Sequence, residues 1–188
     1  MGIAKYLRAA WKKPDVKVLR ARMTEWRKSE VITRVEKPLR LDRARALGYK
    51  AKNGVTVVRI RVGRGGHKKS RPNKGRRTKR LHNRKNLKMN YKEIGEQRVA
   101  RKFSNMEVLN SYQIGKDGMN YFFEVILVDR VAPEIKNDKQ LGPFVRAPKR
   151  RALRGISSAG RKARGLRNSS IKCPKVRPSL RANRGRGN

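Results

Sequence analysis

The chain separates its acidic from its basic residues along the sequence. No Asp or Glu occurs from Arg43 to Lys92, and none occurs from Lys139 to Asn188, so two long stretches carry only positive charge. The 188 residues include 53 Lys and Arg against 13 Asp and Glu, a formal net charge of +40. A compact state with this much like charge repels itself unless a polyanion neutralises it. The pattern therefore predicts a small folded body with basic extensions and an anionic partner.

The N-terminal segment is predicted to form two short helices that pack on the rest of the protein. Apolar residues recur at helical spacing from Ile3 to Trp11, Pro14 ends this first helix, and Asp15 is placed to cap a second one that carries Trp26. Packing is favoured for these aromatic side chains over stacking on bases, although the sequence leaves Trp11, Trp26 and Tyr49 open to either. A further short helix is expected from Asp42 to Leu47, capped by Asp42 and stopped by Gly48.

The middle of the chain switches to the two-residue period of strands. Residues 55–62 alternate Val and Ile with Arg59 and Arg61, which predicts a half-buried strand with arginines on its outer face. An imperfect helical stripe covers 91–103. Residues 106–114 then alternate, with Met106, Val108, Tyr112 and Ile114 expected on one face. A turn signal at 115–118 and an apolar run at 121–128 complete a hairpin whose second strand is central. The fold class is therefore α+β, with a small antiparallel sheet flanked by helices, a long basic loop and a C-terminal extension.

Two segments have little apolar content and much charge. Residues 63–88 form a predicted basic loop, which is expected to become ordered on RNA at an entropic cost. Residues 143–188 are interrupted by Pro and Gly and are predicted to form an extended basic arm, so the single α+β domain is assigned to 1–142.

The sequence offers few groups for catalysis or metal binding. Its two histidines, His67 and His82, both lie in the basic loop, and Cys173 is its single cysteine, so neither a disulfide nor a cysteine-rich zinc site is expected. The glycines at 63–66 follow a strand without the spacing of a dinucleotide fingerprint, and a Walker-type phosphate loop is missing. We expect no enzyme activity, no cofactor, no metal and no small-molecule substrate.

Three anionic partners are conceivable: RNA, DNA and a membrane surface. No run approaches the roughly 18 apolar residues of a spanning helix, and we expect the chain to be cytoplasmic and not to bind membranes. A basic membrane-active protein would leave the sheet and loop unexplained. An architectural DNA binder would explain the charge, but the usual helix-turn-helix, zipper and finger modules are not visible. Phosphate contacts with irregular RNA suit the two basic extensions best, and such contacts position a protein without reading bases.

Three sequence blocks resemble one family. They are Leu47–Gly54 running into Val58–Val62 and Gly65-Gly66, then Val108–Tyr112 with Phe122–Asp129, then Arg154-Gly155 with Ser158–Lys162 and Arg164–Leu166. Together and in this order they resemble large-subunit ribosomal protein fifteen of the archaeal and eukaryotic type. The short C-terminal extension favours the archaeal form.

The resemblance implies a structural component of the large ribosomal subunit, with an α+β core, no catalysis and no cofactor. Its partners would be the large ribosomal RNA and neighbouring large-subunit proteins. Carried over by position, the expected RNA contacts are Lys50, Lys52, Arg59, Arg61 and Arg64 in the first block and Arg154, Arg161, Lys162 and Arg164 in the last.

Charge alone extends this set of expected RNA contacts into the loop and the arm. The additional residues are Lys68, Lys69, Arg71, Lys74, Arg76, Arg77, Lys79, Arg80, Arg84, Arg150, Arg151 and Arg167.

Overall fold

A four-stranded antiparallel sheet forms the centre of the protein. The structure is a computed structural model that describes residues 2–65, 74–76, 87 and 89–167. The strands are β1 (Ile32–Val35), β2 (Val55–Gly63), β3 (Met106–Lys116) and β4 (Asn120–Asp129), in the spatial order β1-β2-β4-β3. The predicted α+β class and the β3–β4 hairpin are confirmed. As expected, β4 is central and its residues from Phe122 to Val128 are buried.

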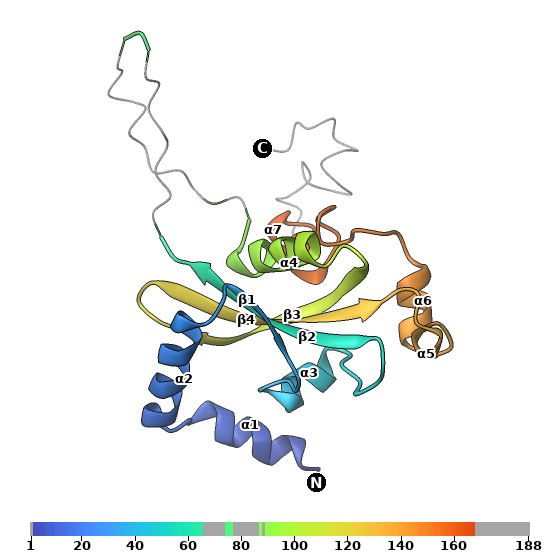
Figure 1. Ribbon diagram of the computed structural model, residues 1–188, viewed down its shortest axis with the longest axis horizontal. Coiled ribbons are helices and arrows are strands. Elements are labelled where there is room, and N and C mark those ends of the chain that lie inside the picture. Colours follow the sequence, from blue (N-terminus) through green and yellow to red (C-terminus); the bar gives the residue numbers. More distant parts are fainter. Residues whose placement is uncertain (1, 66–73, 77–86, 88, 168–188) are drawn as a thin grey trace.

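Three N-terminal helices cover one face of the sheet (Figure 1): α1 (Ala4–Lys12), α2 (Val16–Lys28) and α3 (Leu41–Ala46). The Asp15 carboxylate accepts a hydrogen bond from the Lys17 backbone N–H, so the predicted cap is confirmed. Trp26 is 4% exposed, and its ring centroid lies 5.3 Å from that of Phe122 in β4. Trp11 and Tyr49 pack against the same cluster, so all three aromatic rings belong to packing.

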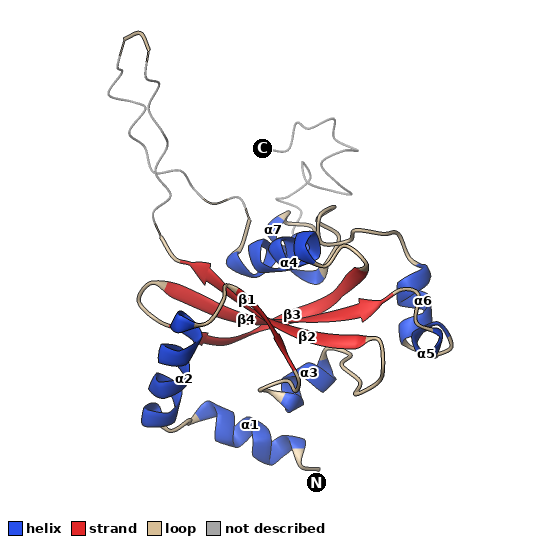
Figure 2. Ribbon diagram, viewed as in Figure 1, coloured by secondary structure: helices blue, strands red, loops and turns tan. Residues whose placement is uncertain are grey.

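Helices α4 (Tyr91–Lys102) and α7 (Ser158–Ala163) lie on the opposite face (Figure 2). Between them and the sheet lie the buried Val58, Ile60, Val99, Val125 and other apolar residues. Helix α5 (Pro133–Lys136) and helix α6 (Leu141–Arg146) form a third small cluster with Val128, at one end of the sheet. Helices on both faces thus bury β4 from Phe122 to Val128, which explains why this run is apolar except at Glu124.

Two details of the predicted elements are wrong. Asp42 lies in the first turn of α3, which begins at Leu41, so it does not cap this helix, whereas Gly48 does follow the helix with a left-handed φ of 97°. In β3, a bulge at Leu109 shifts the pairing between Val108 and Asn110. The extra residue moves Tyr112 and Ile114 to the face opposite Val108, because side-chain alternation changes sign at a bulge.

The first part of the predicted arm is folded onto the domain. Residues 143–167 include the end of α6 and the whole of α7, and Val145, Ala152 and Ala159 are buried. The sequence indicated an extended segment here. The segment has too few apolar residues for a core of its own, but it shares the core that the sheet and α4 provide.

Buried carboxylates fasten distant segments to one another. Six of the thirteen acidic residues are buried: Asp42, Glu93, Glu96, Glu107, Glu124 and Asp138. Glu96 of α4 accepts hydrogen bonds from the hydroxyls of Ser111 in β3 and Ser157 before α7. In β4, Glu124 accepts from the Leu39 backbone N–H and from the Tyr112 hydroxyl. Burial raises the pKa of Glu124, while the hydrogen bond from Tyr112 acts in the opposite direction.

Candidate nucleic-acid interface

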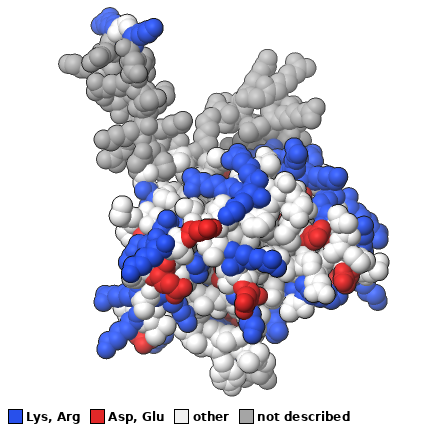
Figure 3. All heavy atoms as spheres, in the orientation of Figure 1, with Lys and Arg blue, Asp and Glu red and all other residues white. Residues whose placement is uncertain are grey.

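Several predicted contact residues lie on the surface of the described part of the chain. Lys74, Arg76, Arg150, Arg154, Arg161, Lys162 and Arg167 are exposed. Figure 3 shows Lys and Arg over much of the coloured part of the visible face, with Asp and Glu as smaller patches. Seven other predicted residues lie outside the described residues, namely Lys68, Lys69, Arg71, Arg77, Lys79, Arg80 and Arg84. His67, His82 and Cys173 lie outside them too.

Two predicted arginines of β2 are used inside the protein. The Arg59 guanidinium donates to the Ser29 hydroxyl at 3.1 Å and lies over the Trp26 ring at 5.4 Å. Burial lowers the pKa of Arg59. The Arg61 guanidinium donates to the Arg27 carbonyl. The face expected to be outer is therefore partly covered by α2. Both arginines are half-buried, and their contacts with α2 and Ser29 hold this helix on the sheet.

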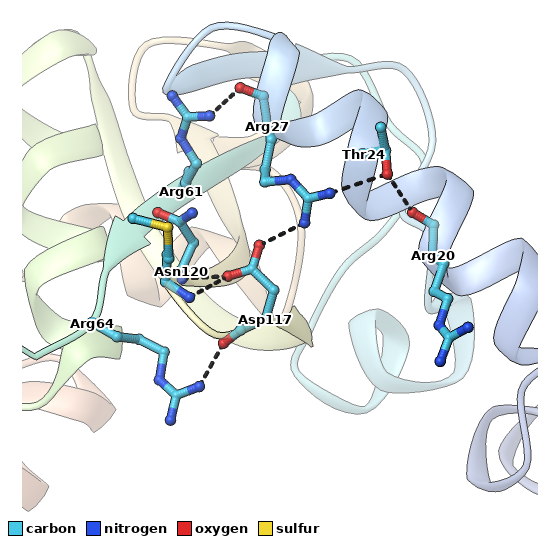
Figure 4. Close-up of polar contacts among 8 residues, drawn as sticks. Arg20, Thr24, Arg27, Arg61, Arg64, Asp117 and Asn120 are labelled. Atoms are coloured by element: carbon cyan, nitrogen blue, oxygen red, sulfur yellow. Dashed lines mark hydrogen bonds and ion pairs between the residues drawn. The ribbon is translucent and has the colours of Figure 1, made fainter.

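Arg64 belongs to a network around the β3–β4 turn (Figure 4). The Asp117 carboxylate accepts from the Arg27 guanidinium at 3.1 Å and from the backbone N–H groups of Met119 and Asn120, and the Asp117 carbonyl accepts from Arg64. Partial burial raises the pKa of Asp117, but the backbone hydrogen bonds and Arg27 outweigh it, so that the pKa is lowered. Arg64 also lies over the Tyr121 ring at 5.0 Å, so its position is fixed although the residue is exposed.

Lys50 and Lys52 share one carboxylate. Both Nζ atoms lie 2.8 Å from oxygens of Asp138, which also accepts from the backbone N–H groups of Gln140 and Leu141. The hydrogen bonds from Lys50 and Lys52 lower the pKa of Asp138 below its usual range. Two lysines on a single carboxylate retain a net positive charge at the surface, while they connect the loop before β2 to α5 and α6.

This lowered pKa predicts how stability depends on pH. An acid whose pKa is lower in the fold than in the unfolded chain contributes stability above about pH 4, and that contribution disappears as pH falls through the folded pKa. We expect Asp138→Asn to be less stable than the parent in urea at pH 7, and the difference to shrink as pH falls towards 3. Asp15→Asn is the control, because Asn caps a helix as well as Asp does. A difference that stays constant with pH would contradict the assignment.

The C-terminal candidates are positioned by the sheet and by one another. Glu107 of β3 accepts hydrogen bonds from the backbone N–H groups of Arg150 and Arg151, both at 2.8 Å. The Arg151 guanidinium lies over the Phe144 ring at 4.4 Å. Arg164 donates to the Gly155 carbonyl at 3.1 Å, and Arg167 donates to the Ser158 hydroxyl at 2.6 Å. Arg150, Arg154, Arg161 and Lys162 thus stand on a fastened segment, with their own side chains exposed.

A basic cleft of about 1110 Å³ runs beside the edge strand β3. One wall comes from α1, α3 and the residue before α3, and carries Arg8, Lys12, Arg40 and Arg43. The other wall comes from α4, α7 and the segment after it, and carries Lys92, Lys162 and Arg167. The single carboxylate in the lining is Asp42, which already lies 3.9 Å from Arg8 and 3.7 Å from Arg40.

The cations of the two walls repel one another. Burial lowers the pKa of Lys92, and its neighbours Arg43, Arg167 and Lys162 lower it further, against the attraction of Glu96. The cations of α3, α4 and the C-terminal segment therefore lie close enough for their charges to repel one another. An anion between them would relieve the repulsion.

Sequence reasoning found only part of this cleft. Lys162 and Arg167 were predicted contacts, whereas Arg8, Lys12, Arg40, Arg43 and Lys92 were not. They come from separate segments that only the fold brings together. The one available signal was that Arg43 and Lys92 mark the two ends of the acid-free central stretch.

Other kinds of site were also sought in the described part of the chain. Residues 2–65, 74–76, 87 and 89–167 contain no group of three or more His, Cys, Asp or Glu arranged to hold a metal ion. None of the helices described there has the length and apolar content to span a bilayer.

Comparison with known proteins identifies the relatives of this chain. The family described as Ribosomal L15 matches residues 2–183. A protein of Methanocorpusculum labreanum named large ribosomal subunit protein eL15 is 48% identical over 187 residues, which cover 97% of this chain and 96% of the relative. A protein of the same name from Methanospirillum hungatei is 49% identical over 187 residues, covering 96% and 95%. With the α+β fold and the family match over nearly its whole length, the chain belongs to the ribosomal L15 family.

Proposed function

We propose that this protein is a structural constituent of the large subunit of the cytoplasmic ribosome. In this role it binds the large ribosomal RNA through phosphate contacts, lies against neighbouring large-subunit proteins, and has no catalytic activity. Two relatives named as large-subunit proteins, each about half identical and covered almost end to end, support the assignment to the subunit.

The proposal that the protein binds RNA rests on where its acidic and basic side chains lie. Of the six buried carboxylates, Asp42, Glu96, Glu107, Glu124 and Asp138 are occupied by internal hydrogen bonds or ion pairs, while most Lys and Arg side chains of the described residues remain at the surface. The acidic residues therefore do little to offset the outer positive potential. A surface of this kind binds a polyphosphate by releasing its counterions, and the affinity falls steeply with salt.

Sedimentation tests the proposal directly. A cell lysate is run on a sucrose gradient at about 0.5 M salt, where adventitious phosphate binding is shed, and the chain is followed by mass spectrometry. We expect it to travel with the large subunit and to be released by ribonuclease. Sedimentation at the top of the gradient, or with DNA, would overturn the proposal.

Arg154 and Arg161 provide a test of the C-terminal contacts. Both are exposed, and their side chains make no hydrogen bond or ion pair with another described residue. Arg164 is less suitable, because its guanidinium supports the turn at Gly155. We expect Arg154→Glu with Arg161→Glu to reduce incorporation into the subunit at least tenfold, since each change replaces an attraction to phosphate by a repulsion.

Lys136→Glu with Lys139→Glu changes the net charge by the same amount at exposed positions beside α6. Incorporation is measured by mass spectrometry of purified subunits, and unfolding curves check the fold. Equal losses in the two double variants would show that total charge decides incorporation and that the C-terminal residues make no particular contact.

A further inference from the structure

We propose that the basic cleft beside β3 binds an unpaired segment of RNA, with phosphates between its two walls and base edges against β3. This inference rests on the proposed RNA-binding function and makes it more specific, because it gives the protein one site that distinguishes single strands from duplexes and reads bases.

The charge of the walls fits a phosphate chain. Arg43 of α3 is exposed, and its side chain makes no hydrogen bond or ion pair with another described residue. It faces a group formed by Lys92, Lys162 and Arg167. These four cations come from three elements far apart in sequence and meet without a free carboxylate between them, since Asp42 is held by Arg8 and Arg40. Such an arrangement has an electrostatic cost in the free protein, and a polyanion removes that cost.

The edge strand supplies groups that match base edges. Asn110 and Gln113 both line the cleft from β3. The Asn110 side-chain oxygen accepts from the Ser111 N–H, and the Gln113 side-chain nitrogen donates weakly to the Gly115 carbonyl at 3.4 Å. Within the described residues the other half of each amide makes no hydrogen bond. The Asn110 amide nitrogen and the Gln113 amide oxygen therefore remain available, one as a donor and one as an acceptor for base edges.

The position of β3 also favours a strand over a duplex. β3 pairs with β4 on one side only, and among the described strands none pairs with its other side. The amides lie at this edge, below walls formed by helices on both faces of the sheet. Unpaired bases can turn towards such a recess, whereas a duplex keeps its base edges inside its grooves. Tyr91, Tyr121 and Phe123 add aromatic surface to the same lining.

The test measures binding of the full-length protein to defined probes. The probes are eight-nucleotide homopolymers of A, C and U, an RNA duplex of equal length, and an oligoglutamate peptide of equal charge, each titrated at several salt concentrations. We expect the single strands to bind more tightly than the duplex and the peptide, with unequal affinities among the three homopolymers.

Two sets of variants separate phosphate contact from base contact. Arg43→Ala with Lys162→Ala should reduce the slope of log affinity against log salt by about 1.4, since each lost phosphate contact on a single strand contributes about 0.7. Arg45→Ala with Arg98→Ala is the matched control, because these exposed residues of α3 and α4 do not line the cleft and are not among the expected RNA contacts. Asn110→Ala with Gln113→Ala should leave the slope unchanged and reduce the preference among homopolymers roughly tenfold.

Several outcomes would overturn the inference. They are tighter binding of the duplex or of the peptide, equal slopes in the Arg43/Lys162 and Arg45/Arg98 variants, and an unchanged homopolymer preference in the Asn110/Gln113 variant. In each of these cases, if the protein still sediments with the large subunit in the sucrose gradient, the proposed ribosomal function stands and only the cleft inference fails. Failure of every RNA probe and of sedimentation with the subunit would overturn both. Unfolding curves of each variant confirm that a loss of binding is not a loss of folding.

Discussion

Glu107→Ala is expected to lower the free energy of unfolding by about 3–5 kcal/mol, the usual cost of breaking a buried charged contact from one side. The Glu107 side chain is 5% exposed, accepts from two backbone N–H groups, and lies 3.8 Å from the Arg130 guanidinium. Alanine removes all three contacts and leaves the half-buried Arg130 guanidinium without its counter-charge. The measurement is chemical denaturation, combined with hydrogen exchange of the Arg150 and Arg151 amides.

The same change is expected to weaken RNA binding, although Glu107 is acidic and too buried to touch RNA. The carboxylate fixes the backbone from which the exposed Arg150 and Arg154 extend. Glu107→Gln retains one acceptor oxygen and should show a smaller loss. Glu134→Ala also raises the net charge by one, but it removes an exposed carboxylate. It should therefore change neither the free energy of unfolding nor the RNA affinity by much. Tighter RNA binding by Glu107→Ala, as expected from charge alone, would contradict a structural role for this carboxylate.

Gly54→Ala is expected to cost about 2–5 kcal/mol in unfolding free energy, from two independent causes. Gly54 has a φ of 82°, where an alanine is strained by about 1–2 kcal/mol. Its added Cβ would also lie 2.8 Å from the Ala132 Cβ and 2.9 Å from Ile135 Cγ1, so the close packing of α5 on the loop before β2 would have to open.

Two other glycines separate these causes. Gly65 has a φ of 70° with no atom within 4 Å of an added Cβ, so Gly65→Ala reports the strain alone. Gly63 has open space and no left-handed backbone, so Gly63→Ala should be close to neutral. The expected order of stability in urea is Gly63→Ala, then Gly65→Ala, then Gly54→Ala. Equal losses of unfolding free energy at positions 54 and 65 would mean that α5 moves aside for the added Cβ without losing stability.

The sequence predicted those elements whose signals are local. The cap at Asp15, the stop at Gly48 and the alternation from Val55 to Val62 depend on neighbours in the chain, and each was recovered. The strand β1 was missed because its four residues, from Ile32 to Val35, contain two polar residues and form a strand only by pairing with β2. The bulge at Leu109 was missed for a related reason, since it exists only in the register between β3 and β4.

The candidate site shows the same division between local and distant signals. The composition predicted that basic residues would lie at the surface. It also identified the basic residues of the C-terminal segment as candidate contacts. It could not show that Arg59 lies under α2, that Glu107 holds the backbone of Arg150, or that Arg43 meets Lys162 across a cleft. Each of these depends on contacts between residues more than 30 positions apart, for which the sequence has no periodic signature.

The outer edge of β3, which pairs with no other described strand, has a consequence for the protein before it meets its partner. An unpaired edge strand is a template on which a second copy can add its own edge and begin aggregation. Here two walls of like charge stand beside that edge, so two copies repel each other as they approach. At about 1 M salt the screening length falls to about 3 Å and this protection weakens. Concentrated salt, which solubilises many basic proteins, should therefore promote edge-to-edge self-association of this one.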